Sequence, residues 1–472
     1  MKRINLKKTA VIALAGLMMT QAALTGCGKK TVDYNVDGTN EQGGEENSGT
    51  KSDRGGLAGR LGVPVSCNET IDPGNSGLGN ITINCEEIQV PEVEKMVVTH
   101  FTPSTLTNED KKKYAETFFE KDKGIYVVDY EHQTKDDIQE QIDWYKKQVD
   151  QAKEEGDTDY LSYLEEEVRN LENSLADAPE TYPEAGDYSG DVFRGTIEGK
   201  EYNMNINGAS TDYPSITTSI YLGPKDYLSF RPYEGATYCY TDTYSYEEAD
   251  NATNASSMTI ESAEDLAGKY LDSLGITDIV KVEEDDLKWV YFGSNDEELA
   301  NEADGYYFKY VRANSGAPVY SGRTWNVDNL NQINGWINTP VESFSISVYD
   351  GEVVDISIEQ VYNTADSVED AELLPYDKII ESANAEIGKY YEKYPPRYKN
   401  IEFNDMRLTY YIVADGEGKA KYIPVWVLSQ YEELMNSDST DDPTQLVVIN
   451  AIDGSVIDLV ENAKSLGCLE EY

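Results

Sequence analysis

The segment YDKIIESANAEIG, residues 376–388, precedes three apolar runs: RLTYYIVA (407–414), YIPVWVLS (422–429) and QLVVIN (445–450). In the first segment apolar residues recur every three or four positions, which is the period of an amphipathic helix, and a glycine closes it. The later runs are rich in β-branched and aromatic residues, as strands are. Asp453-Gly454 then indicates a hairpin turn into a last strand, Val456–Leu459. The stretch predicts one helix on one face of an antiparallel sheet.

The same order of elements occurs once before in the chain. Ser262–Leu274 predicts a helix that Gly275 ends. The strands after it are predicted at residues 288–292, 306–312, 343–349 and 353–358. The C-terminal part is therefore predicted as two consecutive helix-plus-antiparallel-sheet units, residues 261–375 and 376–472, and the predicted fold class is α+β.

Residues 61–260 are predicted as an antiparallel, β-rich N-terminal domain. Its strands are expected at residues 81–84, 95–101, 125–130, 191–197, 201–206 and 216–222. Glu198-Gly199-Lys200 separates two of these runs and predicts a hairpin turn.

A helical hairpin is predicted as an insertion in this domain, at residues 134–178. Thr134 and Asp137 have the spacing of a helix-capping box. Two apolar stripes follow at alternating spacings of three and four, on either side of a Gly156-Asp157 break; they are Ile138, Ile142, Tyr145, Val149 and Ala152, then Leu161, Leu164, Val168, Leu171 and Leu175. Such stripes predict an antiparallel coiled coil. It is either an arm that reaches a partner or a hairpin that buries only its own stripes.

The first residues predict export and a lipid anchor. Four basic residues within positions 1–8 precede an apolar run, Thr9–Leu24, that is too short to be a stable membrane span. The run ends in Leu-Thr-Gly-Cys27, which resembles the lipobox of bacterial lipoprotein signal peptides. The resemblance implies that residues 1–26 are removed and that Cys27 carries the lipid. The mature protein is then expected on the extracytoplasmic face of the bacterial cell membrane, with residues 27–60 as a flexible acidic tether.

The charge of the chain argues against polyanionic partners. The sequence has 39 Lys+Arg against 88 Asp+Glu and a formal net charge of −49. Nucleic acids and anionic membrane surfaces repel such a protein. Contact with the membrane is therefore expected only through the N-terminal lipid, and nucleic acid is not expected as a partner.

Four cysteines remain beyond Cys27, namely Cys67, Cys85, Cys239 and Cys468. Cys67 and Cys85 flank a loop rich in Gly and Asn, and they are the candidate disulfide of an exported protein. Free buried thiols are the alternative.

Two C-terminal motifs carry a family resemblance. YIPVWV (422–427) and VVINAIDGSVI (447–457) resemble the end of PepSY-type and YycH/YycI-type modules, which share a Pro-x-Trp strand and a closing hairpin. Residues 261–360 share only the pattern, because they lack Pro-x-Trp. The whole chain also resembles an uncharacterised family of clostridial-type surface lipoproteins that carry a domain of unknown function. The resemblance implies two PepSY-like units that bind or inhibit an extracytoplasmic partner.

The sequence offers little for catalysis. It has two histidines, His100 and His132, and contains no H-E-x-x-H, G-x-S-x-G, P-loop or G-x-G-x-x-G motif. The acidic run Glu283–Asp286 is interpreted as a solvated loop rather than a cation site. We therefore expect no catalytic residue, metal or cofactor, and a protein that is not an enzyme.

Two functions follow from these observations. The first is a non-catalytic lipoprotein that binds or restrains another cell-envelope protein. The alternative is a surface protein that binds glycans, because an aromatic platform stacks on sugar rings. The tyrosines proposed for that platform are Tyr238, Tyr240, Tyr244 and Tyr246.

Overall fold

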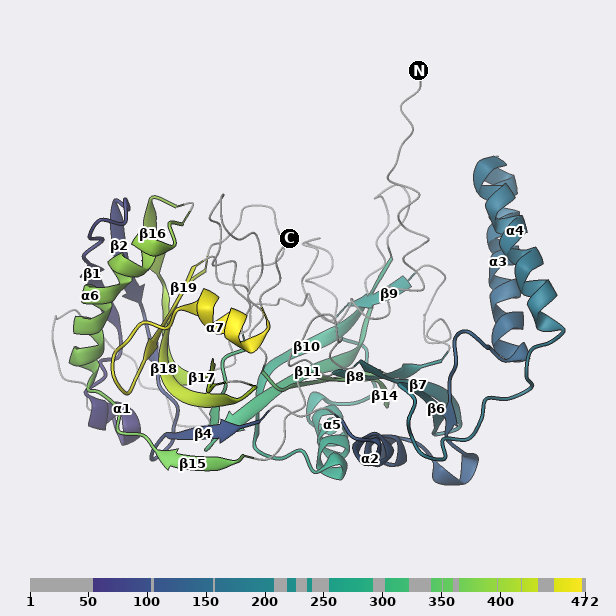
Figure 1. The fold of residues 1–472 in the computed structure, drawn as a ribbon, viewed down its shortest axis with the longest axis horizontal. Coiled ribbons are helices and arrows are strands. Elements are labelled where there is room, and N and C mark those ends of the chain that lie inside the picture. The colour runs from purple at the N-terminus through teal and green to yellow at the C-terminus, as the bar shows by residue number, and fades with distance from the viewer. Residues whose placement is uncertain are drawn as a thin grey trace, which may run out of the picture. The chain divides into compact units, whose positions relative to one another are not determined.

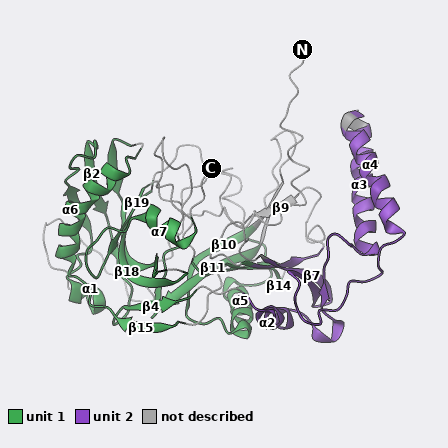
Figure 2. Ribbon diagram, in the orientation of Figure 1, with its two compact units in different colours: residues 1–105, 208–219, 230–472 green, residues 106–207, 220–229 purple. Residues whose placement is uncertain are grey.

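The structure is a computed structural model with an α+β fold (Figure 1). It describes residues 54–102, 106–155, 158–207, 219–225, 236–239, 254–291, 302–321, 341–349, 351–359, 365–396, 398–416, 418–431 and 445–468. Figure 2 shows two compact units: unit 1 holds residues 1–105, 208–219 and 230–472, and unit 2 holds residues 106–207 and 220–229. Over the described ranges, no helix combines the length and the apolar character needed to cross a membrane.

Unit 1 contains a six-stranded sheet in the order β15-β4-β18-β17-β3, with β19 paired to β18. Its strands are β3 (Ile88–Gln89), β4 (Val97–Phe101), β15 (Ser367–Asp370), β17 (Asp405–Ala414), β18 (Ala420–Gln430) and β19 (Gln445–Asn450). A smaller sheet, β1-β2-β16, consists of β1 (Cys67–Ile71), β2 (Asn80–Cys85) and β16 (Asn400–Phe403). The helices beside these sheets are α1 (Gly56–Leu61), α6 (Tyr376–Lys393) and α7 (Leu459–Leu466). Helices and sheets share one core that includes Ile387, Trp426 and Leu459.

A third sheet in unit 1 has the order β14-β13-β11-β10-β9, and β12 pairs with β11. Its strands are β9 (Ala236–Cys239), β10 (Ile279–Tyr291), β11 (Glu302–Asn314), β12 (Ala317–Pro318), β13 (Ser343–Tyr349) and β14 (Glu352–Glu359). Helix α5 (Ile260–Leu274) lies between β9 and β10 in the chain and buries Ala263, Ala267 and Leu271. Thr259 caps the start of α5, and Gly275 ends it with φ +74°. After α5, strands β10, β11, β13 and β14 pair antiparallel, and after α6, strands β17, β18 and β19 do the same.

The N-terminal strands pair with the C-terminal ones. Strand β2 is parallel to β16, β3 is parallel to β17, and β4 is antiparallel to β18. The predicted domain of residues 61–260 groups these strands with residues 106–260, whereas the structure places residues 61–105 in unit 1, together with residues 208–219 and 230–472. Local periodicity predicts strands but carries no information on such long-range pairing.

Two details at the C-terminal unit correct the sequence interpretation. Gly388 does not end α6, because the helix continues to Lys393. A Cβ at Gly388 would lie 2.8 Å from the Asp72 carbonyl oxygen and 2.9 Å from that of Pro73, so the glycine serves close packing. Residues 456–459 are not a strand either. Val456 makes a single bridge to Ile449, and the unpredicted helix α7 begins at Leu459.

Unit 2 holds a sheet in the order β5-β6-β7-β8. Its elements are α2 (Asn108–Phe118), a 3-10 turn (Lys121–Lys123), β5 (Tyr126–Val127), α3 (Lys135–Glu155), α4 (Thr158–Leu175), β6 (Val192–Ile197), β7 (Lys200–Asn207) and β8 (Ser219–Pro224). The predicted turn between β6 and β7 is confirmed: Glu198 and Gly199 both have positive φ, +49° and +83°. Helix α2 was not predicted.

Candidate functional site

The predicted helical hairpin is present as α3 and α4. Thr134 caps α3, because its hydroxyl accepts a hydrogen bond from the Asp137 N–H at 3.3 Å. The predicted stripes face each other and bury Val149, Ala152 and Leu164. These three residues form a small core separate from that of unit 1. The outer part of the hairpin is thus held together by contacts between its own two helices.

An open groove of about 480 Å³ runs along the hairpin. Its lining combines cations, carboxylates and two valines: Lys146, Val149, Asp150, Lys153, Glu165, Val168 and Arg169. Lys146 Nζ contacts Glu172 Oε1 at 2.8 Å, and both side chains are about half exposed. Lys153 Nζ likewise contacts Asp150 Oδ1 at 3.8 Å, so two of the three cations that line the groove are paired with carboxylates of the hairpin.

Aromatic side chains also gather on the hairpin. Trp144 and Tyr145 meet edge to face with ring centroids 4.9 Å apart, and Tyr160 stacks on Tyr163 at 6.4 Å. Tyr163 is 46% exposed. Burial and the neighbouring Tyr163 raise the pKa of Tyr145 to about 12. The heptad pattern predicts Tyr145 as a core residue but gives no signal for the aromatic pair on α4.

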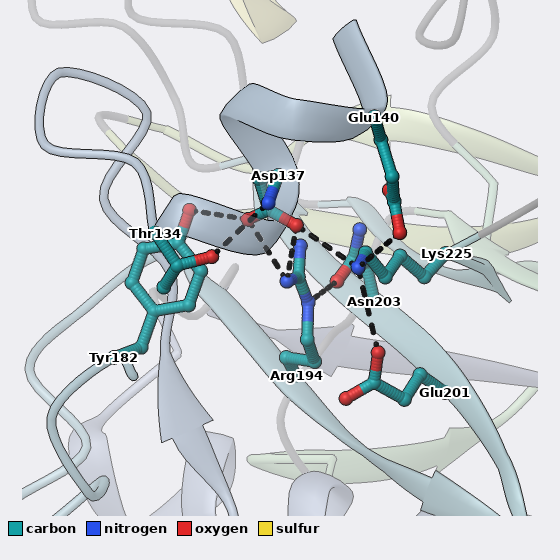
Figure 3. Close-up of polar contacts among 8 residues, drawn as sticks. All are labelled: Thr134, Asp137, Glu140, Tyr182, Arg194, Glu201, Asn203 and Lys225. Carbon is teal, nitrogen blue, oxygen red and sulfur yellow. Dashed lines mark hydrogen bonds and ion pairs between the residues drawn. The ribbon is translucent and has the colours of Figure 1, made fainter. Parts of the chain in front are cut away.

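A buried polar cluster fixes the base of the hairpin (Figure 3). Asp137 stands at its centre on the first turn of α3, and its carboxylate contacts residues of three other segments. Arg194 Nη1 on β6 lies 2.8 and 2.9 Å from the two carboxylate oxygens. Tyr182 Oη donates to Asp137 at 2.7 Å, and Lys225 Nζ, directly after β8, lies 3.0 Å away. The cluster thus ties α3 to two strands and to the segment that follows α4.

The outer contacts of the cluster complete its charge balance. Arg194 Nε donates to Asn203 Oδ1 at 2.9 Å, and the guanidinium lies over the Tyr182 ring. Lys225 Nζ also contacts Glu140 at 3.0 Å and Glu201 at 3.6 Å. Asp137, Arg194 and Lys225 have side chains only 9%, 10% and 12% exposed, so each charge depends on these partners.

Electrostatics in the cluster favour the charged forms. Burial acts to raise the pKa of Asp137, but the hydrogen bonds from Tyr182 and Arg194 outweigh it, so this pKa lies below its usual value. Burial acts to lower the pKa of Lys225, yet the contacts with Glu140 and Asp137 raise it. Burial and the bond to Asp137 raise the pKa of Tyr182. The cluster is therefore a set of buried ion pairs that holds the base of the hairpin in place.

The two histidines are each held by an aspartate. His100 Nδ1 on β4 lies 2.5 Å from Asp415 Oδ2, and Lys421 Nζ contacts the other oxygen of that carboxylate at 3.0 Å. These contacts lower the pKa of Asp415. His132 Nδ1 lies 2.8 Å from Asp129 in an exposed segment, and this contact raises the pKa of His132.

The acidic run Glu283–Asp286 lies within strand β10 and not in a loop, which corrects the sequence interpretation. Lys309 contacts Glu283 at 3.9 Å, and Lys281 contacts Glu284 at 2.5 Å. Asn254 donates to Asp286 at 2.7 Å. Among the residues that the structure describes, no group of three or more His, Cys, Asp and Glu side chains could hold a metal ion.

Several predicted site residues lie outside the described part of the chain. They are Cys27, Tyr240, Tyr244 and Tyr246, and the side chain of Tyr238 is outside it too. The lipid anchor and the glycan platform therefore stay predictions. Cys67 and Cys85 are described; both are buried free thiols, and they stand opposite each other on β1 and β2.

Comparisons with known proteins add little to this geometry. No protein-family model matches the chain, and no curated protein matches it. One solved structure, an uncharacterized protein from Eubacterium rectale ATCC 33656, is 15% identical to this chain with a TM-score of 0.36. The match covers 84% of this chain and 94% of that one. The PepSY and surface-lipoprotein resemblances stay predictions.

Proposed function

We propose that this protein is a non-catalytic, lipid-anchored surface protein that binds or restrains another protein of the cell envelope through the hairpin of α3 and α4. The observation that carries the proposal is the groove on that hairpin. Its lining joins the buried Val149 and the half-buried Val168 to three cations and two carboxylates, namely Lys146, Lys153, Arg169, Asp150 and Glu165. The partner segment that fits such a groove is an acidic amphipathic helix.

Packing supports a helix as the bound element. A third helix laid along a two-helix hairpin covers the part of Val168 that the hairpin leaves exposed, and its own apolar stripe is covered in return. Lysine ammonium groups have three N–H donors, so the contact of Lys146 with Glu172 leaves donors for a second carboxylate. An acidic helix therefore gains both apolar burial and charge pairing here.

The base cluster supports a role for the hairpin as a positioned arm. A docking surface binds more tightly when it is held in place before the partner arrives, because less freedom is lost on binding. Asp137 links α3 to Arg194 and Lys225 through buried ion pairs. The hairpin thus leaves the sheet of unit 2 in a defined direction.

The proposal is tested by capture from detergent-solubilised envelopes with the full-length, lipidated protein. The double variant Lys146→Glu plus Lys153→Glu reverses the charge of the groove, and Lys147→Glu makes the same change at an exposed position outside the groove lining. We expect one envelope protein to be captured by the wild type and by Lys147→Glu, and to be lost with the double variant.

Two further readouts make the capture decisive. The captured protein should contain an acidic amphipathic segment, and hydrogen exchange should show protection of that segment and of residues 146–169 in the complex. Capture that is equal for all three proteins, or protection elsewhere only, would contradict the proposal. A circular dichroism spectrum of each variant confirms that the hairpin is folded.

A further inference from the structure

Two cysteines that lie eighteen positions apart in the sequence are brought face to face by the β1–β2 hairpin. Strands β1 and β2 are antiparallel, and their register pairs Cys67 directly with Cys85. Every residue between them belongs to the two strands or to the Gly- and Asn-rich loop that joins the strands. The cysteine pairing is thus part of the strand register itself.

The pair lies in the core of unit 1. Cys67 is 5% exposed and Cys85 is 2% exposed. The two thiols are close enough to influence each other's pKa, and the buried hydroxyl of Tyr376, at the start of α6, is a further neighbour of Cys67. The Tyr376 ring in turn meets the buried Trp426 edge to face, with centroids 5.9 Å apart. Helix α6 therefore covers the sulfur pair.

The geometry suits a covalent bond between the sulfurs. Directly opposed residues of an antiparallel pair have Cα atoms about 4.5–5.5 Å apart, which is within the range of about 4.4–6.8 Å for disulfides. Closing the bond thus requires no rearrangement of the strands. The third described cysteine, Cys468, differs from this pair because its thiol donates a hydrogen bond to a backbone oxygen, that of Ala463 in α7.

We propose that Cys67 and Cys85 are an oxidation site that closes into a cross-strand disulfide by exchange with a disulfide oxidant before α6 covers them. The site rests on the register and contacts of the two thiols and not on the proposed binding function. Its product is a staple between β1 and β2, and β2 in turn pairs with β16 of the C-terminal part.

The exchange proceeds in two steps. The Cys67 thiolate attacks one sulfur of an oxidant R–S–S–R, which forms a mixed disulfide and releases one R–S⁻. The Cys85 thiolate then attacks the Cys67 sulfur and releases the second R–S⁻. Two protein thiols are oxidised, one oxidant disulfide is reduced to two thiols, and the two protons of the cysteines go to the released thiolates.

In the folded protein the contact with Cys85 lowers the pKa of Cys67, and the same contact raises the pKa of Cys85. The exchange itself takes place before these surroundings form, and it balances in the same way if Cys85 attacks first. Because both sulfurs are buried in the folded protein, exchange needs the hairpin formed but α6 not yet docked.

Refolding of the full chain tests the proposal. The reduced, denatured protein is refolded with either oxidised or reduced glutathione as the probe, alkylated, and mapped by mass spectrometry. We expect a linked peptide containing Cys67 and Cys85 after oxidised refolding, with Cys468 alkylated once the chain is unfolded. We also expect a higher unfolding midpoint for the oxidised protein, since the bond restricts the unfolded chain.

Cysteine variants distinguish stabilisation by the Cys67–Cys85 disulfide from other effects of oxidation on the unfolding midpoint. The midpoint difference between the two preparations should persist in Cys468→Ala and vanish in Cys67→Ala. The mapping needs no variant, so a Cys67→Ala protein that fails to fold does not prevent the test. Recovery of Cys67 and Cys85 as separate alkylated or glutathione-modified peptides after oxidised refolding would overturn the proposal.

Discussion

Two glycines inside helices have opposite surroundings, and the sequence does not distinguish them. A Cβ at Gly388 in α6 would lie within 3 Å of the backbone of Asp72 and Pro73. A Cβ at Gly268 in α5 would meet no atom within 4 Å. The sequence places Gly388 at a helix end, because glycine is common there; only the fold shows that a loop of the N-terminal part packs against this position.

Gly388→Ala is expected to lower the free energy of unfolding by about 1–3 kcal/mol, because the new methyl group meets backbone that cannot move aside cheaply. The matched change Gly268→Ala should raise it by about 0.5–1 kcal/mol, since alanine is the better helix former. Guanidinium denaturation of both variants measures the difference. A stabilising Gly388→Ala would show that α6 does not approach the loop this closely.

At Asp137 one carboxylate holds two buried cations. Asp137→Asn is expected to lower the free energy of unfolding of unit 2 by about 3 kcal/mol, because Arg194 and Lys225 lose their common counter-charge. The control is the exposed neighbour Asp136. Asp136→Asn should change the free energy of unfolding of unit 2 by less than about 0.5 kcal/mol. Equal effects of the two variants, measured by denaturation, would mean that the cluster does not anchor the hairpin.

The stabilisation by Asp137 should also depend on pH with a defined sign. Its folded-state pKa is lowered, so the charged carboxylate contributes fully above the unfolded-state value of about 3.9. The contribution is lost as the pH falls through the lower folded-state pKa. The stability difference between wild type and Asp137→Asn should therefore be constant above about pH 5 and shrink below about pH 4. A difference that grows on acidification would refute this assignment.

At the scale of single elements, local patterns predicted well wherever they were long or periodic. The hairpin, α5 and strands β11, β13, β14, β17, β18 and β19 follow from spacing and residue type alone, whereas the short strands β15 and β16 do not. Helix α2 was missed although Thr107 and Asp110 form a capping box at its start, because its apolar stripe is weak. Helix α7 was missed because Val456–Leu459 has the composition of a strand, while Asp458 acts as a helix cap.

The hairpin of α3 and α4 is expected to unfold locally while the sheet of unit 2 and the sheets of unit 1 stay folded. Leu164 is fully buried between α3 and α4, so Leu164→Ala should cost about 2–5 kcal/mol of hairpin stability. Hydrogen exchange should speed up over residues 135–175 and stay unchanged in β17 and β18. Ser162→Ala on the exposed face is the control. Faster exchange throughout unit 2 would show that the hairpin and its sheet unfold together.

At the scale of the whole molecule, the fold class was predicted but the division into units was not. The parallel pairs β2–β16 and β3–β17 join segments more than three hundred residues apart. No local signal encodes such a pairing, since each strand alone is equally consistent with a neighbour in sequence. The candidate site was predicted in part: the hairpin and Asp137 were identified, but Tyr182, Arg194 and Lys225 come together only in the fold.

The proposed anchor makes a prediction for the whole chain in the cell. Cys27→Ser should move the protein from the membrane fraction to the culture fluid, because a lipid chain is the expected attachment. Cell fractionation with an immunoblot measures the shift, and Cys468→Ser serves as the matched change. Membrane retention of Cys27→Ser after salt and carbonate washing would contradict the lipid anchor.

The most direct test of the binding groove is a titration of the full-length protein with a fluorescent synthetic helix. The peptide carries Leu at alternating spacings of three and four, flanked by Glu, and its control carries Lys in place of Glu. We expect the acidic peptide to bind in preference to the basic one. Lys146→Glu plus Lys153→Glu should weaken its binding at least about tenfold, or about 1.4 kcal/mol, whereas Lys147→Glu should change it less than about twofold. Equal binding of the two peptides, or equal affinities for the double variant and the wild type, would contradict the groove as the docking surface.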